Sequence, residues 1–248
     1  MAQEGIYKNP ILLNQALHKS VKISKVNNFN FTRDLNSVLI TGQEFLEASK
    51  HYPIAFIPNK KGDIVPVAIL GLQQKGNLFV DDAGKWKEGT YIPAFIRRYP
   101  FILAENDSSG ENFSVSVDAA YEGFDKGEGV ALFDDAGSPT NDLNKIIESL
   151  KQYQMQNSIT QEFVKKLTEY NLLKDFAAGV TLPGGEKYGL KGLKMVDEKA
   201  LVGLDDDKAL DLFRKGYLGW IYGHLISLPN FKVLGAAEMK KAAADKEQ

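Results

Sequence analysis

Residues 51–103, HYPIAFIPNKKGDIVPVAILGLQQKGNLFVDDAGKWKEGTYIPAFIRRYPFIL, hold the densest β pattern of the chain. Three short runs rich in apolar and β-branched residues, 54–57, 64–72 and 78–80, alternate with polar connections that contain glycine. Such connections are typical of antiparallel hairpins, because glycine readily adopts the positive φ of tight turns. The pattern therefore predicts an antiparallel meander.

The same stretch closes with a short helix between two prolines. Residues 92–99 are predicted to form one or two helical turns, with Pro93 in the first turn, where its missing N–H costs little. Pro100 ends this helix, and residues 101–104 return to a strand. Pro66 cannot donate to a ladder, so we expect it near a strand end, at a bulge or on an edge.

Upstream of the meander, residues 35–40 form a strand candidate that is followed by a helix start. Thr41 and Glu44 have the Thr-x-x-Glu spacing of a capping box. The order strand, helix, meander predicts an α+β fold rather than a doubly wound sheet.

Downstream, residues 113–118 alternate strictly and predict a half-buried strand. After Pro139 the pattern becomes helical: apolar residues recur on one face over 143–153, and a second capping box at Ser158 predicts a helical hairpin. A last helix is expected over 205–228, with nearby glycines whose cost a bend or close packing would offset.

These elements predict one domain with a mainly antiparallel sheet in its N-terminal half and a helix-rich C-terminal half packed on it. The expected boundaries are a lead-in over 1–28, an α+β domain over 29–235 and a flexible tail over 236–248. Within the domain, 29–135 is the β-rich part and 139–235 the helix-rich part.

Composition narrows the function classes. The chain of 248 residues is 44% apolar and 25% charged, with a net charge of −2, so nucleic-acid binding, which usually needs a basic patch, is not expected. There is no cysteine, which excludes disulfides and thiolate chemistry. No apolar stretch reaches the roughly 20 residues of a membrane span, and the N-terminus lacks the pattern of a classical signal peptide. We therefore expect a cytoplasmic protein, with non-classical export to the cell surface as the open alternative. The sequence does not distinguish a monomer from an oligomer.

Two similar acidic segments raise the question of a metal site. LFVDDAG at 78–84 is matched by LFDDAG at 132–137. Two acidic loops, Asp81-Asp82 and Asp134-Asp135, would then present carboxylates to a cation. Asp and Gly are also what tight turns favour, and neither copy has the ligand spacing of a calcium loop. The turn interpretation is preferred, and no metal or cofactor is predicted.

The candidate binding residues lie at the end of the meander. Arg97 and Arg98 are candidates for a carboxylate clamp, because each guanidinium presents a fork of donors. Alternatively, one of them bridges an acidic turn such as Asp81-Asp82 and the other is solvated. The aromatic neighbours would line a groove or, more simply, belong to the core; they are Trp86, Tyr91, Phe95, Tyr99 and Phe101.

A catalytic site is not indicated. His224 is of the residue type that titrates near neutral pH, but on an apolar helical stripe a core histidine is the simpler interpretation. The sequence contains neither a nucleophile elbow nor a phosphate-binding loop.

A series of short segments carries a family resemblance. They are LNS (35–37), EF (44–45), HYPI (51–54), PVAILGL (66–72), NLFVD (77–81), GKW (84–86), YIPA (91–94), RRYPF (97–101), LF (132–133), VDE (196–198) and IYGHLISL (221–228). In this order they resemble the bacterial SapC family, named for its association with a paracrystalline surface layer, over roughly residues 29–234. The resemblance implies an accessory protein of the surface layer or its export, with a surface-layer or secretion component as protein partner.

Two functions therefore compete. The leading hypothesis is a non-enzymatic binding protein that engages its partner through the aromatic and arginine-rich face. The alternative is an enzyme or small-molecule binder whose pocket is built from Arg97, Arg98, Trp86, Asp81 and His224. A structural subunit of the surface-layer lattice is less favoured, because the chain is neither long nor repetitive.

Overall fold

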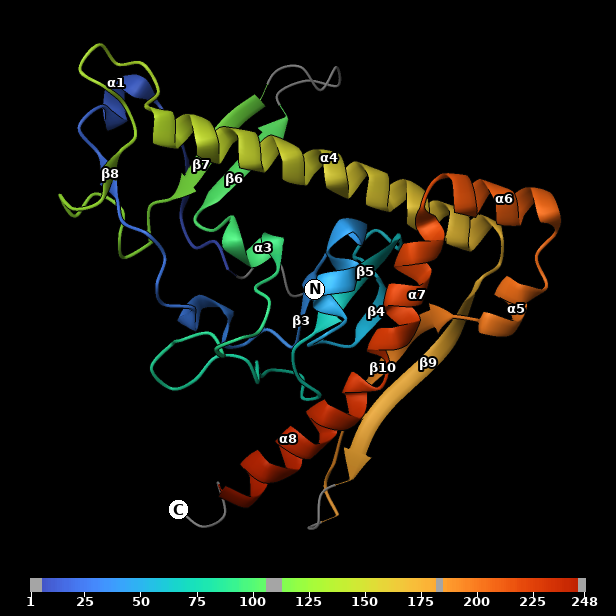
Figure 1. Cartoon of the computed structure of the whole chain (residues 1–248). Coiled ribbons are helices and arrows are strands. Elements are labelled where there is room, and N and C mark those ends of the chain that lie inside the picture. The colour runs from blue at the N-terminus through green and yellow to red at the C-terminus, as the bar shows by residue number, and fades with distance from the viewer. Residues whose placement is uncertain (1–5, 106–112, 182–184, 245–248) are drawn as a thin grey trace.

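The computed structural model describes residues 6–105, 113–181 and 185–244 (Figure 1). The predicted loop at 106–112 and most of the turn around 183–185 lie outside these ranges. The fold is α+β, as predicted: antiparallel sheets dominate the first half and helices the second.

The larger sheet has five antiparallel strands in the order β3-β5-β4-β10-β9. Their bounds are Ser37–Leu39 (β3), Ile54–Pro58 (β4), Ile64–Ile69 (β5), Leu173–Thr181 (β9) and Lys187–Val196 (β10). The β4–β5 hairpin confirms the first two runs of the meander. The third run is not a strand, since it makes only a single bridge between Val80 and Trp86. The outer edge of β5 is occupied by β3 and that of β4 by β10, so neither strand of the hairpin has a free edge for residues 78–80.

The β9–β10 hairpin comes from the half of the chain expected to be helix-rich. Gly179 and Gly189 face each other across it, and a Cβ on either would lie 2.8 Å from a backbone carbonyl oxygen of the other strand. Gly192, at φ +72°, lies where the register shifts between Leu190 and Leu193. These glycines therefore fit a close backbone approach and a bulge.

Two smaller antiparallel sheets involve the lead-in, which is paired with the domain as far as the structure describes it. One has the order β1-β7-β6 and the other pairs β2 with β8. The strands are Pro10–Leu12 (β1), Lys22–Ile23 (β2), Phe101–Glu105 (β6), Phe113–Asp118 (β7) and Val130–Ala131 (β8). The predicted strands at 101–104 and 113–118 are both confirmed.

Helix α4, Asn141–Glu169, is one continuous helix of 29 residues, and Figure 1 shows it running across the molecule from the α1 and β8 end to α6. The predicted helical hairpin is wrong. The hydroxyls of Ser158 and Thr160 donate to the carbonyl oxygens of Gln154 and Gln156, four residues earlier. The hydroxyl of the predicted cap residue Ser158 is thereby satisfied inside the helix, as is that of Thr160.

The last predicted helix is divided in two. Gly216 has φ +72° and separates α6, Asp206–Arg214, from α7, Tyr217–Ser227. The chain continues as α8, Asn230–Ala244. Residues 236–244 were expected to belong to a flexible tail; they are helical instead. Glu238 is buried there and accepts hydrogen bonds from the Leu72 N–H and the Gln73 side chain, both at 2.9 Å.

The remaining helices are single turns. They are α1 (Gln15–His18), α2 (Phe45–Ala48), α3 (Ala94–Arg97), α5 (Glu198–Val202) and the 3-10 turns η1 (Asn30–Thr32) and η2 (Gly42–Glu44). The capping box predicted at Thr41 and Glu44 is present at η2, and α3 begins directly after Pro93. Among the described residues, no helix combines the length and apolar character needed to cross a bilayer.

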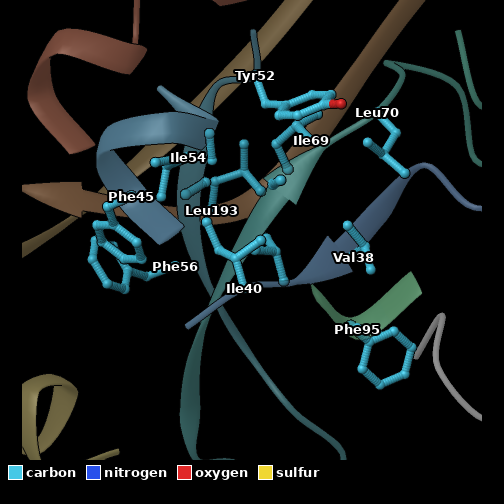
Figure 2. Close-up of a cluster of buried hydrophobic side chains, with 14 of the residues drawn as sticks. Val38, Ile40, Phe45, Tyr52, Ile54, Phe56, Ile69, Leu70, Phe95 and Leu193 are labelled. Atoms are coloured by element: carbon cyan, nitrogen blue, oxygen red, sulfur yellow. The ribbon is translucent and has the colours of Figure 1, made fainter. Parts of the chain in front are cut away.

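The core gathers side chains from the larger sheet and α2 (Figure 2). Phe163 of α4 extends this cluster, with its ring centroid 6.0 Å from that of Phe45 and 5.2 Å from that of Trp220 on α7. Burial of these large rings fixes α4 and α7 against α2 and the sheet. The position of α4 then determines the pocket described next.

Candidate ligand-binding pocket

A pocket of about 1110 Å³ lies between α3 and α4, and we call it the α3–α4 pocket. Its lining comes chiefly from three parts of the chain: residues 23–29, residues 91–101 and the 142–156 stretch of α4. Figure 1 shows α3 beneath the middle of α4. Of the residues predicted for the site or the groove, those that line this pocket are Arg97, Arg98, Tyr91, Tyr99 and Phe101.

Glu44 holds in place the wall of the pocket that α3 and the residues before it form, which we call the α3 wall. The buried carboxylate accepts a hydrogen bond from the Thr41 N–H (2.8 Å), which is part of the capping box, and a second from the Thr41 hydroxyl (3.0 Å). Its other oxygen accepts from the Ala94 N–H at 2.7 Å and from the Tyr91 hydroxyl at 2.9 Å. A negative charge is favourable at this position, because Ala94 is the first residue of α3 and its N–H has no partner within the helix.

Arg97 is exposed at the surface of this wall. Its Nε donates to the Ile92 carbonyl oxygen at 2.9 Å and its Nη2 to the Tyr91 hydroxyl at 3.0 Å. The guanidinium carbon also lies 5.4 Å from the Tyr91 ring centroid. Burial, together with the Glu44 charge, raises the pKa of Tyr91 to about 12 against the lowering effect of Arg97. Tyr91 is therefore a neutral donor near neutral pH.

Arg98 is half-buried and lies against two aromatic rings. Its guanidinium carbon is 4.2 Å from the Phe95 ring centroid and 4.8 Å from that of Tyr153 on α4. The Nε is buried without a hydrogen-bond partner, and no carboxylate of a described residue forms an ion pair with Arg98. Burial raises the pKa of Tyr153 well above its usual range, although the Arg98 charge acts in the opposite direction. Arg98 is thus a cation that is stabilised by π faces and lacks an anion.

Tyr99 is largely a structural residue. Its ring stacks on Phe31 with centroids 4.0 Å apart, and its hydroxyl donates to Asp118 Oδ2 at 3.2 Å. Burial first, and the Asp118 charge second, raise the pKa of Tyr99 far above its usual range. Asp118 is fully buried and also accepts from the Lys8 and Asn9 N–H groups. Asp118 therefore anchors the lead-in to the domain, and the Tyr99 ring adds a contact with Tyr7 at a centroid distance of 5.5 Å.

The other predicted aromatics belong to the core. Phe95 is 3% exposed and contributes its ring face to Arg98. Trp86 lies outside the pocket, packed against Phe79 and Phe29 at centroid distances of 6.3 and 5.7 Å. The core interpretation is right for both residues, and no aromatic groove forms from the whole predicted set.

His224 is sealed inside the protein. Its Nε2 accepts from the Val196 N–H at 3.1 Å, and its Nδ1 donates to the Ile54 carbonyl oxygen at 2.9 Å. The side chain is 0% exposed, and burial lowers its pKa from 6.5 to about 4. His224 is therefore neutral near neutral pH, and its two hydrogen bonds link α7 to β4 and to β10. The five-residue pocket of the alternative hypothesis is therefore not formed, because His224, Trp86 and Asp81 lie outside the lining that Arg97 and Arg98 share.

The two acidic loops form the same turn twice. Asp81 Oδ1 accepts from the Lys85 N–H and Asp134 Oδ1 from the Ser138 N–H, each at 2.8 Å. Gly84 and Gly137 occupy the matching positions at φ +77° and +83°. Asp82 is exposed and pairs with Arg33 at 3.1 Å, while Asp135 belongs to the exposed second loop. The part of the chain that the structure describes contains no group of three or more acidic or histidine side chains arranged for a metal ion.

Sequence reasoning missed Tyr153 as a site residue. Tyr153 lies on the apolar stripe over 143–153. That pattern predicts that its side chain is buried, but it does not indicate which side chain it contacts. Lys25 and Lys145 also line the pocket and carry no signal in the sequence that separates them from other surface lysines.

Neither the curated proteins nor the solved structures gave a match. The SapC family model matches residues 13–234, which include both the larger sheet and every wall of the α3–α4 pocket. The chain therefore belongs to the SapC family.

Proposed function

We propose that this chain is a non-enzymatic accessory protein of the bacterial surface layer or of its export, and that it binds another protein through the α3–α4 pocket. The link to the surface layer rests on the family. The binding role rests on one observation, the Arg98 guanidinium that faces two aromatic rings without an anionic partner.

Three further features support a binding role. Arginine and aromatic residues are enriched where proteins bind one another, and Arg97, Arg98, Tyr91 and Tyr153 all line this pocket. The Glu44 bonds hold the α3 wall in one position before any partner arrives, which reduces the entropy lost on binding. None of the chain's three histidines lines the pocket, and its buried acid Glu44 is already occupied by four hydrogen bonds.

The test is affinity purification from cells of the native organism with mass spectrometry of the co-eluting proteins. Tagged wild-type protein is compared with Arg97→Ala and Arg98→Ala. Arg214→Ala is the matched control, because Arg214 is exposed on α6 outside the pocket. Circular dichroism checks that each variant is folded.

We expect a surface-layer or secretion component to co-elute with the wild type and with Arg214→Ala. Capture by Arg98→Ala should fall by about tenfold or more, the loss expected for an interface hot spot. Retained capture by both pocket variants would remove the binding role, and a partner unrelated to the surface layer would remove the family-based part.

A further inference from the structure

We propose that the α3–α4 pocket recognises a carboxylate of the partner's polypeptide, with Arg98 as its counter-charge. This inference rests on the proposed function, since both place the partner in the same pocket. It adds the chemical group that is recognised and the residue that binds it.

The charges around the pocket favour an anion. The basic lining residues are Lys25, Arg97, Arg98 and Lys145, and the acidic ones are Glu44 and Asp142. Asp142 lies 3.8 Å from Lys145 and offsets it, and Glu44 is enclosed by its four donors. The pocket is thus locally positive on a chain whose net charge is −2, and such a site attracts an opposite charge from the partner.

Arg98, rather than Arg97, is the residue available for that charge. Arg97 already donates from Nε and Nη2 to neutral oxygens of its own wall. The Arg98 Nε is buried without any acceptor. Contacts with Phe95 and Tyr153 stabilise the positive charge through the ring quadrupoles. The Tyr7 hydroxyl forms a side-chain hydrogen bond with Arg98, but a hydroxyl and two rings bring no negative charge. The positive charge of this guanidinium is therefore left for a ligand.

The ligand chemistry follows from this balance. A carboxylate carries one negative charge and two oxygens that match the donor fork of a single guanidinium. A phosphate carries about 1.5 to 2 charges near neutral pH, more than one unpaired arginine neutralises. The apolar side chains of Val26, Ile92 and Ile146 also line the pocket and suit the uncharged remainder of a peptide segment.

The chain has four arginines, Arg33, Arg97, Arg98 and Arg214, so their Nε–Hε resonances are resolvable by NMR and assignable with single Arg→Gln variants. We would titrate the full-length protein with Ac-Ala-Val-Phe, which has a free carboxylate, and with its C-terminal amide. Ac-Ala-Glu-Phe-amide tests an acidic side chain, and the phosphoserine peptide Ac-Ala-pSer-Phe-amide tests a phosphate.

We expect saturable shifts of the Arg98 resonance with one or both carboxylate peptides, at least about tenfold weaker binding of Ac-Ala-Val-Phe-amide, and no shift of Arg214. A terminal and a side-chain carboxylate are distinguished by which of the two peptides binds. Arg98→Lys keeps the charge but loses the fork, so it should weaken carboxylate binding while Arg214→Lys does not.

Equal binding of the acid and the amide, binding of the phosphopeptide alone, equal shifts at Arg214, or no binding of any peptide would each overturn the carboxylate inference. None of these results decides the proposed function, which is judged by partner capture in the affinity purification. Conversely, loss of that partner would leave a carboxylate-selective Arg98 shift in place.

Discussion

The Glu44 carboxylate accepts a hydrogen bond from the Ala94 N–H at 2.7 Å, and this contact joins the capping box of η2 to the first residue of α3. The two residues are fifty positions apart in the chain. Because α3 is only four residues long, it depends on such outside contacts for its position. The wall that carries Arg97 and Arg98 is therefore oriented by a carboxylate that lies next to the larger sheet.

We predict that Glu44→Gln destabilises the protein by about 1–3 kcal/mol, because the amide replaces one acceptor oxygen with a donor that faces buried N–H groups. Urea unfolding followed by circular dichroism measures this change. Glu47→Gln is the control, since Glu47 is exposed and paired only with Lys50, and it should cost less than about 1 kcal/mol. Equal effects of the two substitutions would contradict the role given to Glu44.

We predict that His224 makes folding stability fall as the pH drops below neutrality. The folded pKa of about 4 lies below the ordinary 6.5, so the unfolded chain takes up the proton first. The contribution is fully present above about pH 6.5 and is lost progressively toward pH 4. The stability lost from this source between neutral pH and pH 5 is about 2 kcal/mol.

Urea unfolding at pH 7.5 and pH 5 checks this dependence against His224→Asn. The variant should be less stable at both pH values, because it loses the ties to Ile54 and Val196, but its stability should change less between them. His51, whose pKa is also lowered mainly by burial, remains in both proteins and cancels in the comparison. Identical pH dependences would show that His224 is not the titrating group.

Two glycines of the α6–α7 region should respond to alanine with opposite signs. Gly216 adopts φ +72° between the helices, so Gly216→Ala should destabilise by about 1–2 kcal/mol through backbone strain. Gly219 lies inside α7 with nothing within 4 Å of an added Cβ, so Gly219→Ala should stabilise by about 0.5–1 kcal/mol. Thermal unfolding of both variants measures the difference, and a shift of equal sign would refute the assigned break at Gly216.

The docking of α8 is tested at Glu238. Replacement by alanine leaves the Leu72 N–H and the Gln73 amide without their acceptor, so Glu238→Ala should cost about 1–3 kcal/mol. Lys240→Ala, on the exposed face of the same helix, should have little effect. If the two variants unfold at the same denaturant concentration, α8 is not held through Glu238.

Local patterns in the sequence were sufficient to predict those features whose contacts span only a few residues. The capping box at Thr41 and Glu44, the short helix after Pro93 and the β4–β5 hairpin are all set by nearest neighbours along the chain. The repeated Asp-Gly turn is of the same kind, because each aspartate bonds to an N–H group four residues later. Such features recur wherever the same residues stand at the same spacing.

The residues that surround Arg98 in the pocket could be identified only from the tertiary structure. Nothing in the pattern around Arg98 indicates that Tyr153, on a helix more than fifty residues later, would meet its guanidinium, or that Glu44 would support α3. The continuity of α4 was also decided by packing, since Phe163 and Thr160 are held against α2, α7 and η2. The fold class, the local turns and the family could be read from the amino-acid sequence alone, because these depend on short-range patterns. Which charge remains without a partner depends on every neighbour at once, and only the folded chain brings those neighbours together.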